Sequence, residues 1–116
     1  MKTKAGDHRV EIREKARGGK GSVELHHLLE MEQLAPNSRL LCKTIIEPGN
    51  SMGFHIHEGE SEFFYVFSGV AKFYDGNEEA LLYPGDTYFT PSGSGHSIEV
   101  IGEKPLEYLA LVMKSA

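Results

Sequence analysis

Cysteine and long apolar runs are scarce in this sequence of 116 residues, and tryptophan is absent. The single cysteine, Cys42, cannot form an internal disulfide bond, and it lies in an apolar run where a small buried thiol packs well. No stretch approaches the roughly 18 apolar residues of a membrane span. The N-terminus has charges but no apolar block behind them, as a secretory signal would need. We therefore expect a cytoplasmic protein in which Cys42 belongs to the core.

Basic residues are also scarce outside the N-terminal segment. Residues 1–21 hold seven of the twelve Lys and Arg residues but only three of the seventeen Asp and Glu residues. The remaining body is therefore acidic, and an acidic body repels phosphate backbones. We expect no nucleic-acid partner and no membrane partner. We interpret residues 1–21 as a charged, partly flexible arm and residues 22–116 as one β-barrel domain, because a chain of this length has room for one core.

Short runs of β-favouring residues follow the arm, and Gly, Pro, Asn and Asp separate them. Helical periodicity is weak everywhere except around residues 29–34. Many short strands at this spacing are typical of an antiparallel sandwich or barrel, and Asp75-Gly76 between two runs predicts a hairpin. The predicted strands are 23–29, 39–46, 52–57, 62–68, 70–74, 78–83, 86–90, 96–101 and 106–113.

The predicted strand 62–68 is apolar on both faces. Alternation directs Glu62 to one face and an aromatic row to the other. A strand that is apolar on both sides must be covered on both, and the chain has no spare apolar segment for the outer side. We expect a homodimer in which the outer row meets its copy. The row consists of Phe63, Tyr65 and Phe67.

Three histidines and a glutamate form a candidate metal site. His55 and His57 flank one residue, so their imidazoles share a strand face about 7 Å apart. Glu62 can return to that face because Gly59 can turn the chain, and His96 follows a glycine-rich corner. Imidazole and carboxylate ligands suit Mn²⁺, Fe²⁺, Co²⁺, Ni²⁺, Cu²⁺ or Zn²⁺. Four protein ligands on a six-coordinate ion leave two positions open for water or substrate.

The spacing around these residues resembles a known family signature. Five residues separate Gly49 from His55, and one residue separates His55 from His57. Four residues then lead to Glu62, and six more lead to Gly69. This pattern is similar to the first motif of the cupins at every defined position. A second stretch resembles the second cupin motif: Gly, five residues, Pro-x-Gly, two residues and His. It runs from Gly85 through Pro91 and Gly93 to His96.

Two long motifs in the right order make this resemblance specific. The fifteen residues between them match the spacing of compact bacterial cupins, and the similarity covers roughly residues 39–113. One departure is Val100, where the family pattern often has Asn, a residue that is not a metal ligand. The resemblance implies a double-stranded β-helix of jelly-roll type with a divalent metal on His55, His57, Glu62 and His96.

The remaining histidines and acids have plainer interpretations. His26 and His27 are adjacent and face opposite ways on a strand, so they are interpreted as structural, as is His8 in the arm. Glu58 and Glu60 are expected in a solvated loop, with a place beside the metal ligands or at the rim as the alternative. The barrel interior is predicted to be mainly apolar, with a few polar groups. The apolar candidates are Met52, Phe54, Phe64, Val66, Ile98 and Leu109 or Leu111, and the polar ones are Thr44, Tyr74, Tyr83 and Tyr88.

Function is less constrained than fold. A bound metal can polarise a substrate, hold a nucleophile or, as Fe or Mn, activate oxygen. The resemblance allows sugar or sugar-phosphate isomerases, dioxygenases and oxalate-handling proteins. We expect a metal-dependent isomerase or oxygenase acting on a small metabolite. The alternative is a non-catalytic protein that binds a sugar or a carboxylate on the metal. An anionic ligand would need basic residues at the pocket, and only Arg39, Lys43 and Lys72 come from the predicted strands.

Overall fold

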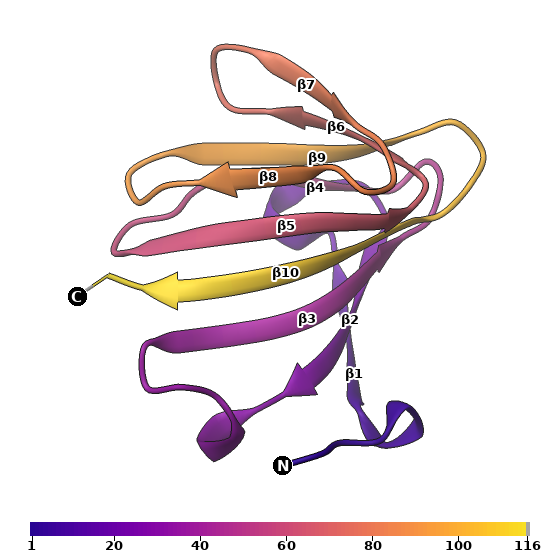
Figure 1. The fold of residues 1–116 in the computed structure, drawn as a ribbon. Coiled ribbons are helices and arrows are strands. Elements are labelled where there is room, and N and C mark those ends of the chain that lie inside the picture. The colour runs from indigo at the N-terminus through magenta and orange to yellow at the C-terminus, as the bar shows by residue number, and fades with distance from the viewer. Residues whose placement is uncertain (116) are drawn as a thin grey trace.

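The computed structural model describes residues 1–115 as two antiparallel sheets packed into an all-β jelly-roll barrel (Figure 1). One sheet has the strand order β1-β2-β3-β10-β5-β8 and the other β4-β9-β6-β7. The strands are β1 (Arg9–Glu14), β2 (Ser22–Leu29), β3 (Ser38–Ile46), β4 (Ser51–Ile56), β5 (Glu60–Ser68), β6 (Val70–Tyr74), β7 (Glu79–Leu82), β8 (Thr87–Thr90), β9 (Gly95–Ile101) and β10 (Leu106–Lys114). Short 3₁₀ turns are η1 (Ala5–Asp7), η2 (Ala16–Gly18) and η3 (Met31–Gln33).

The sequence predicted nine of these strands, β2 to β10, with their ends within two residues. The weak helical signal near residue 30 corresponds to η3. The predicted hairpin also forms: β6 and β7 pair antiparallel, and the side chain of Asp75 accepts hydrogen bonds from the backbone N–H groups of Asn77 and Glu78. Gly76 has φ +96°, which glycine adopts without steric cost.

The core lies between the two sheets. Its largest fully buried side chains include Phe73, Ile46, Ile98 and Leu106. Cys42 is also fully buried, as predicted, and burial raises the pKa of its thiol to about 12. The thiolate is therefore suppressed near neutral pH, and Cys42 acts as a small apolar side chain.

Several residues predicted to fill the barrel interior lie elsewhere. The pairing of β4 with β9 shifts register between Met52 and His55, so both of these side chains reach the interior while Phe54 is 45% exposed. Tyr74 and Tyr83 are exposed as well. In β10 the buried positions run from Leu106 in steps of two, which directs Leu109 and Leu111 outward.

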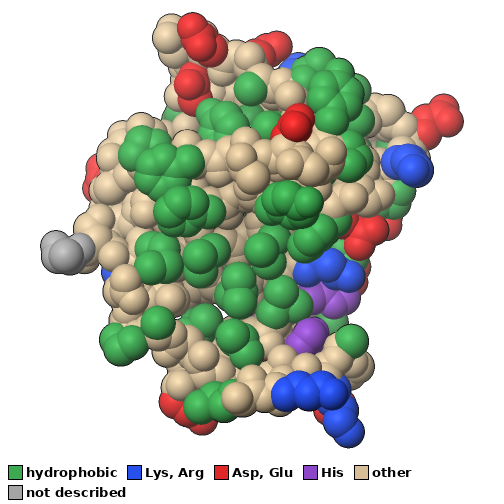
Figure 2. Space-filling view, viewed as in Figure 1, with side chains coloured by type: hydrophobic (Ala, Val, Ile, Leu, Met, Phe, Trp, Pro, Cys, Tyr) green, Lys and Arg blue, Asp and Glu red, His purple; other side chains and the backbone are tan. Residues whose placement is uncertain are grey.

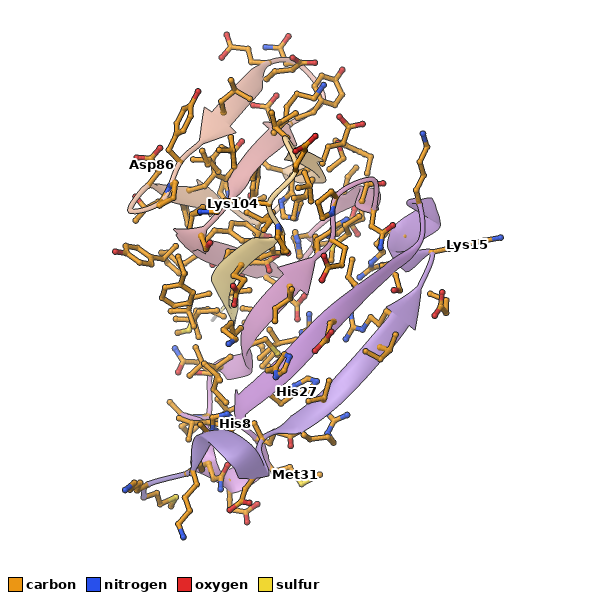
Figure 3. All side chains as sticks on the ribbon, turned by 90° about the vertical axis from the view of Figure 1, so that its right-hand side faces the viewer. His8, Lys15, His27, Met31, Asp86 and Lys104 are labelled. Carbon is orange, nitrogen blue, oxygen red and sulfur yellow. The ribbon has the colours of Figure 1, made fainter. Side chains whose placement is uncertain are left out.

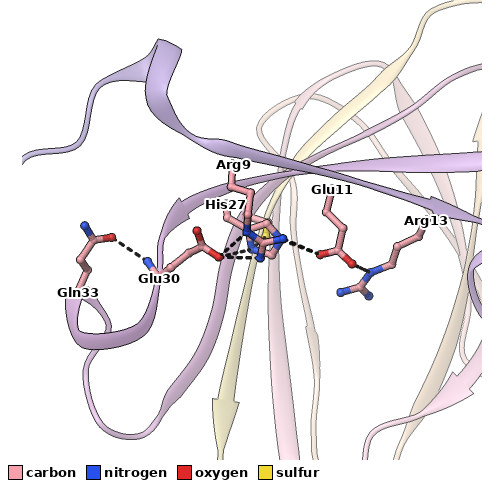
Figure 4. Close-up of polar contacts among 7 residues, drawn as sticks. Arg9, Glu11, Arg13, His27, Glu30 and Gln33 are labelled. Atoms are coloured by element: carbon pink, nitrogen blue, oxygen red, sulfur yellow. Dashed lines mark hydrogen bonds and ion pairs between the residues drawn. The ribbon is translucent and has the colours of Figure 1, made fainter.

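The basic arm contains a strand, β1, that was not among those predicted. β1 pairs with β2 from Arg9↔His27 to Glu14↔Ser22. A chain of polar contacts fixes this edge (Figure 4): Glu11 Oε1 lies 2.8 Å from His27 Nε2, and Arg13 donates to the other oxygen of Glu11 at 2.8 Å. Arg9 donates to Glu30 at 2.6 Å. These contacts fasten the arm to the barrel.

Glu11 makes the anchoring of this strand sensitive to acid. The hydrogen bond from Arg13, followed by the one from His27, lowers the pKa of Glu11 from 4.5 to about 2. A lowered pKa means that its stabilising effect is complete above pH 4.5 and is lost as the pH falls toward 2. Glu11→Gln is expected to lower the unfolding free energy at pH 6 by about 1 kcal/mol, since the pair is partly exposed. Thermal melts should show this deficit shrinking toward pH 3.

Glu14→Gln, at the end of the same strand, is the control, because Glu14 forms no ion pair within residues 1–115, and it should show no deficit at pH 6. A deficit in Glu11→Gln that stayed constant from pH 6 to pH 3 would contradict the assignment.

The outer face of β5, β8 and β10 is apolar. Figure 2 shows hydrophobic side chains gathered over these strands. Phe63, Tyr65 and Phe67 are 42–47% exposed, as the alternation predicted. Phe89 on β8 adds to the row, with its ring centroid 4.8 Å from that of Phe63. Among residues 1–115 no helix is long and apolar enough to cross a membrane.

Candidate metal centre

The four predicted ligands come together at one end of the barrel. His55 and His96 are direct partners across β4 and β9, His57 follows β4, and Glu62 comes from β5 of the opposite sheet. One ligand atom from each residue lies within 4.8 Å of all the others. Gly59, at φ +73°, makes the turn that returns the chain from His57 to Glu62. The arrangement has the dimensions of a single-ion site.

Hydrogen bonds orient two of the imidazoles. Nδ1 of His55 donates to the backbone carbonyl of Gly53 at 2.9 Å, which leaves its Nε2 as a lone-pair donor. Nδ1 of His96 lies 2.9 Å from Oγ1 of Thr90, on β8. In the tautomer that donates to Thr90, Nε2 of His96 is also free to bind a cation.

The nitrogens that face the centre lack partners of their own. Among residues 1–115, the buried side-chain N and O atoms without a hydrogen bond are Nε2 of His57 and Nε2 of His96. Nε2 of His57 lies 2.9 Å from Oε1 of Glu62 but forms no hydrogen bond with it, and Nε2 of His96, at 3.6 Å, is too far for one. Buried polar nitrogens without a hydrogen bond lower the stability of the folded state. A cation among them and Glu62 would satisfy all three groups, so the residues fit a metal.

Burial favours the protonation state that a metal needs. His96 is fully buried, and burial, followed by the charges of His55 and His57, lowers its pKa to about 3. Burial also lowers the pKa of His55. Neutral imidazole is the form that binds metal, so protons compete weakly for these two ligands near neutral pH.

The metal site lies in a cavity of about 420 Å³ that His55, His57 and Glu62 line together with residues from β2, β3 and β10. Much of the wall is apolar. Tyr108 and Thr44, paired across β10 and β3, supply hydroxyl groups, and burial raises the pKa of Tyr108. Thr44 was predicted as an interior polar group, whereas Tyr108 was missed. The apolar wall consists of Leu25, Leu40, Met52, Ala110 and Val112.

Four basic residues stand around the same cavity: Arg13, Lys15, Arg17 and Arg39. Arg39 pairs with Glu60 and Arg13 pairs with Glu11. Within residues 1–115, no acidic side chain forms an ion pair with Lys15 or Arg17. The sequence identified Arg39 as a basic strand residue but missed the other three, because it assigned them to a solvated arm. The alternation of polar and apolar residues in β1 was a signal that could have placed Arg13, whereas Lys15 and Arg17 lie beyond the end of that strand.

The residues given structural roles from sequence lie outside the metal site. His27 is buried and belongs to the polar contacts that fasten β1, whereas His26 pairs with Glu24 at 2.7 Å. His8 hydrogen-bonds to Thr3. Glu58 is exposed, as expected of a solvated loop. Glu60 instead begins β5, is half-buried and lies 3.9 Å from Nδ1 of His57.

Fold, motifs and ligand geometry together define the class of protein. The family model described as a cupin domain matches residues 43–112, and the chain belongs to the cupin family. Thr90 and Phe64, which contact His96, lie within the matched region.

Two similar proteins and one solved structure have names that refer to oxalate. The chain is 43% identical to an oxalate-binding protein of Thermotoga maritima over 97 residues, or 84% of this chain and 80% of that one. It is 34% identical to an oxalate decarboxylase of Bacillus subtilis over 71 residues, which is 57% of this chain but only 18% of that protein. A crystal structure described as a predicted oxalate decarboxylase from Thermotoga maritima superposes with a TM-score of 0.92 at 38% identity, covering 98% of this chain and 99% of that one.

Proposed function

We propose that this cupin holds a divalent transition metal on His55, His57, Glu62 and His96 and binds a small dicarboxylate, of which oxalate is the simplest, on that metal. The observation that carries the proposal is the pair of unpartnered buried nitrogens of His57 and His96 beside the Glu62 carboxylate. The ion, when bound, supplies Lewis acidity and open coordination positions. The chain supplies the four ligands and the cavity around them.

The surroundings of the site support an anionic ligand. The cavity is small and half enclosed by apolar residues, and its charged rim includes two cations without acidic partners. A buried metal with such a rim attracts a compact anion more strongly than a neutral sugar. The name of the 43% identical relative, an oxalate-binding protein, agrees with this chemistry.

Ligand binding tests the proposal directly. The protein is stripped with a chelator and reloaded with Mn²⁺, and oxalate binding is measured by calorimetry for both forms. We expect oxalate to bind the Mn²⁺ form at least about 100-fold more tightly than the stripped form, because the metal provides most of the binding energy for a chelating anion. Equal binding to both forms, or to neither, would overturn the proposal.

The isomerase or oxygenase activity expected from the sequence stays a prediction. The same metal site supports binding without turnover, which was the alternative. The relatives named for oxalate include both a binding protein and a decarboxylase. We favour binding because a carboxylate on the metal accounts for the residues of the cavity without a further catalytic group.

We also propose that the chain forms a homodimer through the outer face of β5. A face that carries Phe63, Tyr65, Phe67 and Phe89 exposes contiguous aromatic surface, and such surfaces mark contacts with other chains. A groove of about 320 Å³ between this row and Leu109 and Leu111 offers a place for aromatic side chains of a second copy.

A further inference from the structure

The turn η2 at the tip of the β1–β2 hairpin is built against the mouth of the metal cavity. Figure 1 shows it beside β4, at the end of the arm. Ala16 is buried in the core cluster, and the backbone N–H of Ser51 donates to the carbonyl of Lys20 at 2.9 Å. The segment is thus fixed to the strand that carries His55.

Two glycines permit this close approach. A Cβ added at Gly19 would collide with the carbonyl oxygen of Ser51, and one added at Gly53 would collide with the carbonyl oxygen of Arg17. The backbones of η2 and β4 therefore touch with no side chain between them. The position of Arg17 relative to His55 follows from this backbone contact.

Arg17 occupies a strained backbone position within this turn. Its φ of +55° and ψ of +29° lie in the left-handed region, which glycine adopts at lower cost. Lys15 is left-handed too, at φ +49°. Non-glycine residues in this region persist where the surrounding structure holds them, and they gather at functional sites. The backbone contact between η2 and β4 is the structure that holds Arg17 in this conformation.

Among the described residues, Arg17 and Lys15 are the two basic residues of the cavity that form no ion pair. Arg13 and Arg39 already pair with Glu11 and Glu60. Figure 3 shows Lys15 at the end of the hairpin with its side chain directed away from the barrel. Arg17 lines the cavity that contains His55, His57 and Glu62, and the described acidic residues form no ion pair with it.

We infer that Arg17 is a specificity-determining residue that binds the outer carboxylate oxygens of a dicarboxylate held on the metal. The inference rests on the proposed function. A dicarboxylate that chelates an ion with one oxygen of each carboxylate keeps two oxygens for other contacts. A guanidinium presents parallel N–H donors in the spacing of such an oxygen pair. A hydroxy acid such as glycolate also chelates through two oxygens but offers only one outer oxygen, so Arg17 adds to the preference for oxalate over glycolate.

The test compares Arg17→Gln with the parent protein, both loaded with Mn²⁺ and both assayed for metal content. We expect unchanged Mn²⁺ content, about a 10-fold weaker oxalate affinity and a smaller change for glycolate, so that the oxalate-to-glycolate ratio falls. Lys20→Gln removes the same charge from the same segment outside the cavity and should leave the ratio unchanged. Gly19→Ala keeps every charge but pushes η2 from β4, and it should reproduce the loss seen in Arg17→Gln.

The outcomes separate the two claims. A parent protein that loads Mn²⁺ and binds oxalate, together with an Arg17→Gln variant whose affinity ratio is the same, would overturn the role of Arg17 and leave the proposed function standing. An equal fall of the ratio in Lys20→Gln would also overturn it, since bulk charge would then explain the effect. A parent protein that binds no metal or no oxalate refutes the proposed function and this inference with it.

Discussion

His57→Ala is expected to lower the affinity for Mn²⁺ or Zn²⁺ by at least about 100-fold, because loss of a direct ligand exceeds the 10–100-fold cost of losing an outer-shell partner. The change removes one of the two unpartnered buried nitrogens that face Glu62. Metal content after dialysis against limiting metal, measured by elemental analysis, checks this result. The double variant His55→Ala, His57→Ala should hold no ion at all.

The barrel should survive these changes, since His57 lies at the rim of the core and circular dichroism can confirm the fold. His26→Ala is the control, because His26 pairs with Glu24 on β2 away from the cavity. Parent-like metal content in the double variant would refute the assignment of the ligands.

Phe63→Glu combined with Tyr65→Glu is expected to convert the proposed dimer into a monomer of 12.9 kDa. Two charges placed in an apolar contact must be desolvated without partners, at a cost of several kcal/mol that a modest interface cannot offset. Light scattering at micromolar concentration should show the parent at twice the monomer mass and the variant at the monomer mass.

Leu81→Glu serves as the matched control for this pair, because Leu81 is an exposed apolar residue on β7 of the other sheet. It should leave the mass unchanged. A monomeric parent would refute the dimer, and a dimer that persists in the double variant would refute this face.

The cluster of His55, His57, Glu62 and His96 that could hold a metal was largely predictable from the sequence, because most of the signals for it lie close together in the chain. The spacing of His55 and His57 places them on one face by strand geometry alone, and the turn at Gly59 returns Glu62 beside them. His96 is the exception. Its place opposite His55 depends on the pairing of β4 with β9, which no local pattern specifies. The glycine-rich corner before it and the order of the two family motifs brought it into the predicted ligand set.

The cavity was harder to predict because it depends on irregularities. Strict alternation cannot place Met52 and His55 on the same side, and the register shift between them does so. The basic arm was interpreted from its net charge, whereas its strand is held by the pairing of Glu11 with His27 and by the backbone contact at Gly19. Such contacts join residues far apart in sequence, so composition does not reveal them.

The position of Glu62 on the sheet opposite the histidines couples metal supply to the stability of the fold. An ion bound by all four residues connects the two sheets at the mouth of the barrel, where no disulfide does so. By mass action, each tenfold excess of free metal over its Kd adds about 1.4 kcal/mol to the free energy of unfolding. A domain of this size is stable by about 5–15 kcal/mol. If the ion binds as proposed, its concentration would therefore change the free energy of unfolding of the chain as well as its affinity for a ligand.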